Sequence, residues 1–218
     1  MELNDRGLVL YTWGNVSQID RERGVLAIKP SGVPYAQLTA DDMVVVDLDN
    51  RRVEGRLNPS SDTRTHTHLY RNFPDIGGVT HTHSTYATAW AQAQQEIPCF
   101  GTTHADYAYG AIPCTAVMSD AQIERDYEEE TGVQITDAFR DRDPAETPMV
   151  IVAGHAPFSW GKDAAESVYH AVVLEEIARM AYLTRVIDPS RGPLKPAIVD
   201  KHYLRKHGKD AYYGQGPE

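Results

Sequence analysis

Cysteine is scarce in this chain, which has only Cys99 and Cys114 among its 218 residues. Two isolated cysteines match no zinc-ligand spacing and are too few for the disulfide framework of a small secreted domain. Long apolar segments are also missing, since the longest run, near residue 150, is far shorter than the roughly 20 residues that cross a bilayer. The first residues lack a basic segment followed by an apolar stretch, so no secretory signal is expected. We therefore expect a cytoplasmic protein with reduced cysteines.

An excess of positive charge is lacking as well, because 31 acidic residues outnumber 21 basic ones and give a formal net charge of -10. The electrostatic field of a chain with this negative charge repels nucleic acid and anionic membranes, so neither is expected as a partner. One basic cluster at 201–209 suits either a few anionic groups of a small substrate or a solvated surface. No repeat or low-complexity tract occurs, and residues 1–218 are enough for one domain with a single core.

The pattern most suggestive of chemistry is a His-x-His pair behind a double glycine. A glycine turn leads into a β-prone stretch in which alternate side chains share a face, so His81 and His83 converge. Taken alone, such a pair is more often explained by packing or surface exposure. Asp62, at a predicted helix start, and His155, after a predicted buried strand, extend it to one carboxylate and three imidazoles. This donor set suits zinc, manganese or cobalt, although His66, one helical turn after Asp62, is a rival ligand by spacing.

Three loops could bind an anion near these residues. They contain Gly14 with Asn15, Ser31 with Gly32, and Ser60 with Ser61. Free backbone N–H groups in glycine turns and at helix starts attract phosphate, although ordinary turns and helix caps explain each loop as well. Asp106 lies in a polar loop, where an aspartate can act as a general base or only close a turn. With a Lewis-acid metal, these features suggest chemistry on a small phosphorylated hydroxy-carbonyl compound.

The rest of the sequence predicts a mixture of strands and helices. Strands are expected at 8–11, 25–28, 43–48, near 52–55, at 97–103 and at 148–155, and helices from 62, at 84–94, from 119 and at 164–186. In the longest helix the expected buried stripe is Ala171, Leu174, Ala178, Ala181 and Tyr182, with Glu175 and Arg179 on the solvent side and His170 structural. The acidic helix that starts at Ser119 and presents Tyr127 is expected to be structural.

Six motifs carry a resemblance to a known family. They are TWGNVS at 12–17, IKPSG at 28–32, PSSDT at 59–63, HTHS at 81–84, GTTHADY at 101–107 and DKHYLRKHG at 200–208. In this order, over nearly the whole chain, they resemble the sugar-phosphate epimerases of the class II aldolase/epimerase superfamily. The resemblance implies an α/β, single-domain fold with a central, mostly antiparallel β-sheet sandwiched by α-helices. The superfamily usually begins with a longer N-terminal helix, so that helix is expected to be shortened here, and the last few residues are expected to be disordered.

The resemblance also implies roles for individual residues. The metal ligands fall on Asp62, His81, His83 and His155, which decides against His66, and the implied ion is zinc, with manganese or cobalt as substitutes. Substrate and phosphate contacts fall on Gly14, Asn15, Ser31, Gly32, Ser60 and Ser61, with Lys29 nearby. The implied proton-transfer pair is Asp106 and Tyr213, with His202 and Arg205 close to the tyrosine. The resemblance further implies a four-fold symmetric homotetramer in which a neighbouring subunit supplies the tyrosine.

The activity implied by the resemblance is epimerisation at carbon 4 of L-ribulose 5-phosphate, which gives D-xylulose 5-phosphate. The hydrogen on carbon 4 is not adjacent to the carbonyl, so its removal would leave an unstabilised carbanion. Cleavage between carbons 3 and 4 instead gives an enediolate, so retro-aldol cleavage, rotation of the aldehyde and re-addition form the expected route. One rival is an aldolase that releases the aldehyde, although related aldolases carry a glutamate where Asp62 stands. The other is a non-catalytic scaffold, which would have lost metal ligands.

Overall fold

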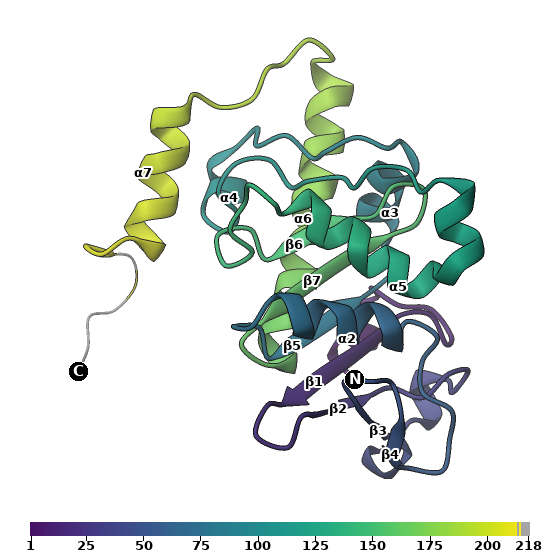
Figure 1. Cartoon of the computed structure of the whole chain (residues 1–218). Coiled ribbons are helices and arrows are strands. Elements are labelled where there is room, and N and C mark those ends of the chain that lie inside the picture. Colours follow the sequence, from purple (N-terminus) through teal and green to yellow (C-terminus); the bar gives the residue numbers. More distant parts are fainter. Residues whose placement is uncertain (213, 215–218) are drawn as a thin grey trace.

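The computed structural model describes residues 1–212 and 214, and within them the strands form one seven-stranded sheet. The strands are β1 (Asn15–Asp20), β2 (Val25–Ile28), β3 (Val44–Asp47), β4 (Arg52–Glu54), β5 (Gly78–His81), β6 (Met149–Ile151) and β7 (Pro157–Gly161). Their order is β4-β3-β2-β1-β5-β7-β6, and every neighbouring pair is antiparallel, which confirms the expected sheet (Figure 1). Central β1 and β5 pair Asn15 with His81, so a predicted substrate contact lies beside a predicted ligand.

Helices cover both faces of this sheet. They are α1 (Glu2–Asp5), α2 (Thr63–Asn72), α3 (Thr85–Gln92), α4 (Thr102–Ala105), α5 (Asp120–Ala138), α6 (Ala164–Ile187) and α7 (Pro196–His207), with short 3-10 turns at Tyr35–Gln37 and Ala40–Asp42. Val79 of β5 packs in one core cluster with Leu69 of α2, whereas the next residue, Thr80, hydrogen-bonds Ser167 of α6. Because successive strand residues point to opposite faces, α2 and α6 lie on opposite sides of the sheet.

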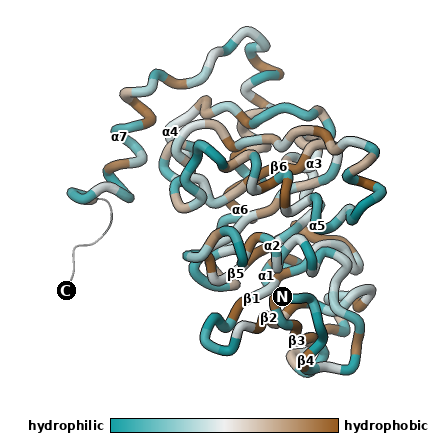
Figure 2. Tube along the Cα trace, in the orientation of Figure 1, coloured by the Kyte–Doolittle hydropathy of each residue, from teal (hydrophilic) through white to brown (hydrophobic). Residues whose placement is uncertain are grey.

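The core is divided between these two faces. On the face of α2 and α5 it contains Phe73, Phe139 and Trp160, with ring centroids 5.1 to 5.8 Å apart. A second cluster lies between α3, α6 and the edge strand β6 and is built largely from alanine, isoleucine and leucine side chains. Figure 2 shows hydrophobic segments (brown) around β6 and α3, whereas the turn that joins β1 to β2 is hydrophilic. Among the described residues, no helix combines the length and the apolarity needed to cross a membrane.

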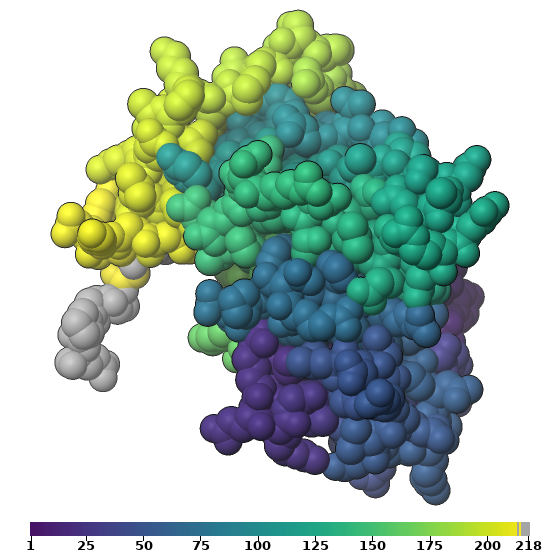
Figure 3. Space-filling view, in the orientation of Figure 1, coloured from purple at the N-terminus to yellow at the C-terminus, as the bar shows by residue number. Residues whose placement is uncertain are grey.

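The C-terminal helix α7 lies at one flank of the molecule. Figures 1 and 3 show it (yellow) beside the body of the fold, reached through the segment that follows α6. It contacts the short helix α4, and Val199 packs there against Cys99 and Ala105. These contacts, together with hydrogen bonds from α7 to Asp106, hold the basic cluster of α7 beside α4.

The first part of the chain differs from the sequence prediction. The prediction of a strand at 8–11 is wrong, and the strand that pairs with β2 is Asn15–Asp20. Tyr11 (φ 53°) and Gly14 (φ 72°) adopt positive φ and interrupt an extended conformation before β1. Leu8 and Val9 bury their side chains in a separate small cluster with Leu3, so their apolar character reflects packing.

The second half also contains differences. The predicted strand at 148–155 is shorter, β6 being followed by a turn through Gly154 (φ 71°), and β7 was not predicted. Within α6, Tyr182 is 49% exposed rather than buried, and its ring lies 5.8 Å from that of Tyr86, centroid to centroid, whereas the other four residues of the predicted stripe are buried. Glu175 does not face solvent freely, since its carboxylate accepts the backbone N–H groups of Tyr86 and Ala87 at the start of α3.

Candidate active site

One cavity collects most of the predicted site residues. Its volume is about 610 Å³. The predicted residues that line it are Gly14, Asn15, Ser31, Gly32, Ser60, Ser61, Asp62, His81, His83 and His155, together with Lys29. They come from the loop before β1, the loop after β2, the start of α2, the end of β5 and the turn after β6. Segments far apart in the sequence therefore meet at one end of the central strands.

Three histidines form the floor of this cavity. One ligand atom from each of His81, His83 and His155 lies within 4.8 Å of the others. The Nδ1 atom of His81 lies 2.9 Å from the carbonyl oxygen of Pro157, which assigns the proton to Nδ1 and leaves a lone pair on Nε2. That Nε2 lies 3.1 Å from Nε2 of His83. Two imidazole nitrogens that close are both satisfied when they share a cation, so the group fits a divalent metal ion.

Asp62 stands beside these imidazoles. Its Oδ2 lies 3.9 Å from Nε2 of His81 and accepts a hydrogen bond from Nδ2 of Asn15 at 2.6 Å. Burial raises the pKa of Asp62, but two effects outweigh it and hold the pKa below its ordinary value: attraction to His81 and His66, which take up protons in the same acidic range, and the hydrogen bond from Asn15.

The imidazoles are held neutral. Burial lowers the pKa of His81 to about 3, and burial also lowers the pKa of His83 and of His155. Neutral imidazoles beside an ionised carboxylate are the protonation states that bind a metal.

His66 takes no part in this cluster. It is fully buried between α2 and the sheet, and its Nδ1 atom lies 2.7 Å from Oγ of Ser17. The same serine hydroxyl lies 2.8 Å from the hydroxyl of Tyr70, so His66 belongs to a polar chain inside the core. Burial lowers its pKa to about 4. His66 therefore lies one helical turn after Asp62, where its side chain is buried against the sheet and does not line the cavity.

The glycine loops surround a buried ammonium group. Lys29 is 4% exposed, and its Nζ atom donates to the carbonyl oxygens of Thr12 and Pro30 at 3.4 and 3.2 Å. Gly14 approaches β5 so closely that a Cβ atom there would lie 2.7 Å from the carbonyl oxygen of His81. Asn15 also donates to Oγ of Ser60 at 3.0 Å and so links two of the loops. This wall offers one positive charge and several hydroxyl and backbone donors, which suits a phosphate.

The predicted proton-transfer residues lie elsewhere. Asp106 does not line the cavity but follows α4, where its carboxylate accepts hydrogen bonds from Arg205 at 2.8 Å and from His202 at 3.0 Å, with Lys206 Nζ at 3.6 Å. Burial raises the pKa of Asp106, but the hydrogen bonds from Arg205 and His202 outweigh it and hold the pKa below its usual range. Tyr213 lies outside the described residues, so its predicted position stays a prediction.

Two residues of α5 that line the cavity were missed by sequence reasoning. Tyr127 and Glu128 line the cavity although the acidic helix α5 was expected to be purely structural. The Tyr127 ring lies 6.1 Å from that of His155, centroid to centroid. Burial and the charges of Asp62 and Glu128 raise the pKa of Tyr127, so its hydroxyl keeps a proton. Helical periodicity does not single out Tyr127 and Glu128 as cavity residues. The one local signal in the sequence is the acidic run around them, which interrupts the apolar pattern of the helix.

The sequence matches the profile of a known family, the class II aldolase and adducin N-terminal domain, over residues 1–182. The chain belongs to this family. L-ribulose-5-phosphate 4-epimerase UlaF of Salmonella paratyphi B is 55% identical over 215 residues, which cover 99% of the present chain and 94% of that protein. The protein of the same name from Salmonella typhi is also 55% identical, with the same coverage.

Solved structures of class II aldolases share the fold. An L-fuculose 1-phosphate aldolase aligns with a TM-score of 0.81 over 94% of this chain and 90% of that one, at 23% sequence identity. The L-fuculose-1-phosphate aldolase of Thermus thermophilus gives a TM-score of 0.69 over 87% and 93% of the two chains, also at 23% identity. Identity at this level establishes the shared architecture alone. Class II aldolases are metal-dependent, and the three-histidine cluster could hold such a metal.

Proposed function

We propose that this class II aldolase-family protein is a metal-dependent epimerase that interconverts L-ribulose 5-phosphate and D-xylulose 5-phosphate. The observation that carries the proposal is 55% identity to epimerases of that name over nearly the whole length of both chains. The cavity supports it, because the imidazoles and the phosphate-type loops open into the same space. A pentulose phosphate has a carbonyl group that suits a metal held by the imidazoles and a dianionic phosphate that suits the loops.

Asp62, His81, His83 and His155 would hold the metal, which we propose to be zinc, with manganese or cobalt able to replace it. When bound, such an ion supplies a Lewis acid that draws electron density away from the ketose carbonyl. Neighbouring groups prepare the ligands: the backbone carbonyl of Pro157 fixes the tautomer of His81, and the side chain of Asn15 holds the carboxylate of Asp62.

The loops with Gly14, Gly32 and Ser61 would bind the phosphate, and the buried Lys29 would supply its counter-charge. This anchoring matters because cleavage between carbons 3 and 4 separates the sugar into two fragments, of which glycolaldehyde phosphate carries the phosphate. A fragment held by its phosphate rotates about the bonds near its aldehyde carbon and presents the other face without leaving. Release is thereby disfavoured and re-addition favoured.

Asp106 and Tyr213 would transfer protons on opposite faces of the aldehyde. Since Asp106 lies outside the cavity of its own chain, among His202, Arg205 and Lys206, we propose that this cluster and Tyr213 complete the cavity of an adjacent subunit. A homotetramer with active sites at subunit interfaces meets that requirement. We further propose that residues 1–218 act as one domain and that the enzyme works in the cytoplasm, in pentose or ascorbate catabolism.

The test is a coupled assay of purified, metal-loaded protein in both directions, with the metal content measured on the same sample. We expect the zinc-bound protein to interconvert the two pentulose phosphates. Absence of conversion in both directions with a full complement of zinc would refute it. Accumulation of free glycolaldehyde phosphate as the main product would instead identify an aldolase that releases its aldehyde.

A further inference from the structure

Helix α5 is interrupted next to the cavity. Asp126 has φ -170° and ψ 93°, which is an extended conformation, and helical geometry resumes after it. Its Oδ1 atom accepts the backbone N–H of Glu129 at 3.2 Å, so Asp126 caps the second helical piece. Tyr127 and Glu128 are the first two residues of that piece and line the cavity. The interruption therefore determines where this wall of the cavity stands.

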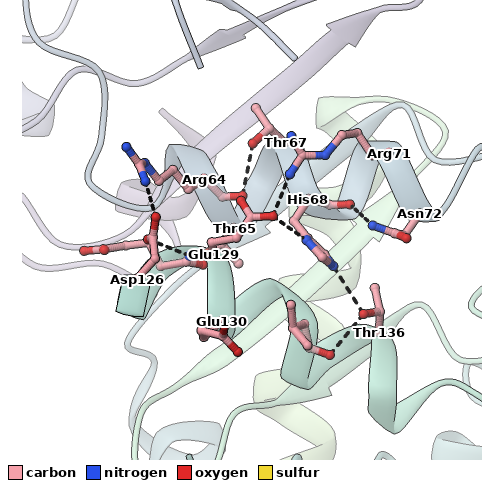
Figure 4. Close-up of polar contacts among 12 residues, drawn as sticks. Arg64, Thr65, Thr67, His68, Arg71, Asn72, Asp126, Glu129, Glu130 and Thr136 are labelled. Carbon is pink, nitrogen blue, oxygen red and sulfur yellow. Dashed lines mark hydrogen bonds and ion pairs between the residues drawn. The ribbon is translucent and has the colours of Figure 1, made fainter. Parts of the chain in front are cut away.

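Two arginines and a histidine of α2 hold the interrupted segment in place. Figure 4 shows Arg64, His68 and Arg71 of α2 pointing toward Asp126 and Glu129 of α5. Arg64 forms an ion pair with Asp126, and Nη2 of Arg71 and Nδ1 of His68 each lie 2.7 Å from Oε1 of Glu129. We call these five residues the α2–α5 clamp.

Two further contacts bring the helices together. The Thr65 hydroxyl donates to the backbone carbonyl oxygen of Glu128 at 2.6 Å, so α2 also holds the backbone beside Tyr127. Gly132 permits the close approach, because a Cβ atom there would lie 2.6 Å from the Cβ atom of His68.

The clamp joins two walls of one site. Asp62 is the N-cap of α2, and Tyr127 follows the interruption in α5, so a contact that fixes α2 against α5 also fixes the carboxylate relative to the phenol. Among the described residues, the Tyr127 hydroxyl makes no hydrogen bond, and the residue is 39% exposed and lines the cavity. A phenol that keeps its proton at neutral pH is a hydrogen-bond donor.

We propose that Tyr127 donates a hydrogen bond to an oxygen of the bound sugar and that Asp126 and Glu129 are positioning residues that act through it. The inference rests on the proposed function, because the acceptor is an oxygen of the pentulose phosphate. If the clamp served only stability, substituting its residues would lower the free energy of unfolding, and the effect on kcat/KM would be the same with or without the Tyr127 hydroxyl. The two roles therefore differ in how the effects of substitutions combine.

A double-mutant cycle tests this relation. Tyr127→Phe removes the hydroxyl and keeps the ring, and kcat/KM is expected to fall about tenfold, the effect of one hydrogen bond. Asp126→Asn removes the ion pair with Arg64 but keeps a side-chain oxygen for the cap, and an approximately three- to fivefold loss is expected. Because the clamp acts through the phenol, the double variant should be no worse than Tyr127→Phe alone. Zinc content should stay unchanged throughout.

Asp137→Asn is the matched control, since Asp137 lies on the same helix and pairs with Arg140 at 2.8 Å, and neither residue lines the cavity. It should keep the wild-type kcat/KM. Losses that multiply in the double variant, or wild-type kinetics in Tyr127→Phe, would overturn the inference.

A second measurement does not depend on epimerase activity. Backbone amide hydrogen exchange of the metal-loaded protein should accelerate in peptides that cover 124–131 in Asp126→Asn and stay unchanged there in Asp137→Asn. Equal exchange in the two variants would show that the clamp does not hold the segment, and the inference would fall even if the wild type is inactive. An inactive wild type would refute the proposed function separately.

Discussion

Gly14 offers a sharp test of how backbone geometry builds the site. It has φ 72° and lies so close to β5 that a Cβ atom would meet the His81 carbonyl oxygen at 2.7 Å and Cα of Thr82 at 3.3 Å. In Gly14→Ala the left-handed conformation costs about 1–2 kcal/mol, and the clash adds roughly 1–3 kcal/mol because backbone must shift. We expect the free energy of unfolding to fall by roughly 2–5 kcal/mol in total.

The displaced atoms belong to the strand end that carries His81 and His83, so function should suffer beyond stability. We expect kcat/KM to fall about 100-fold, as misplacement by an ångström can cause, and zinc to be held less tightly. Gly7→Ala is the control, since Gly7 has a similar φ of 70° but nothing within 4 Å of its Cβ position. Urea denaturation, zinc analysis and steady-state kinetics of both variants would measure these losses of stability, metal affinity and activity. If the two variants show equal losses of stability and Gly14→Ala keeps wild-type kinetics, the reasoning is refuted.

Three more predictions concern titratable groups. His155→Ala should lose stoichiometric zinc while His66→Gln keeps it, and metal analysis of both checks the assignment; zinc loss from His66→Gln alone would contradict it. Asp106→Asn should lower kcat by about 10²-fold or more and retain zinc, whereas loss of zinc would make the residue structural. Burial lowers the pKa of His104 to about 4 from 6.5, so the unfolded state binds more protons between these values and stability falls as pH drops through that window. His104→Gln should flatten that dependence by up to about 3 kcal/mol, measured by urea denaturation from pH 7 to pH 4, and an unchanged slope would contradict the buried, neutral state.

The sequence was most informative where local geometry decides the outcome. Strand alternation predicted that His81 and His83 share a face, and both line the cavity, although β5 ends at His81 and His83 lies in the segment after it. Spacing alone left Asp62 and His66 equivalent, because one helical turn separates them and only the depth of α2 against the sheet distinguishes the two side chains. The family resemblance, rather than the spacing, favoured Asp62.

Features that depend on tertiary contacts were not predictable in the same way. The residues at 8–11 have strand propensity but pack as a loop, because positive φ at Tyr11 ends any extended run. Tyr127 lines the cavity directly after the interruption of α5 at Asp126, and Asp126 is held by Arg64 of α2, about 60 positions earlier. Asp106 was assigned a proton-transfer role by resemblance, which stays a prediction, and its position away from the cavity goes with the packing of α7 on α4.

The central claim is that the protein inverts carbon 4 by breaking and remaking the bond between carbons 3 and 4. Conversion of L-ribulose 5-phosphate in D₂O, followed by proton NMR of the product, tests it most directly. Cleavage and re-addition predict D-xylulose 5-phosphate that carries no deuterium on carbon 4, because the original hydrogen stays on the aldehyde carbon throughout. Deuterium on carbon 4 of the product would show that this hydrogen is removed and replaced from solvent, and it would rule out this route.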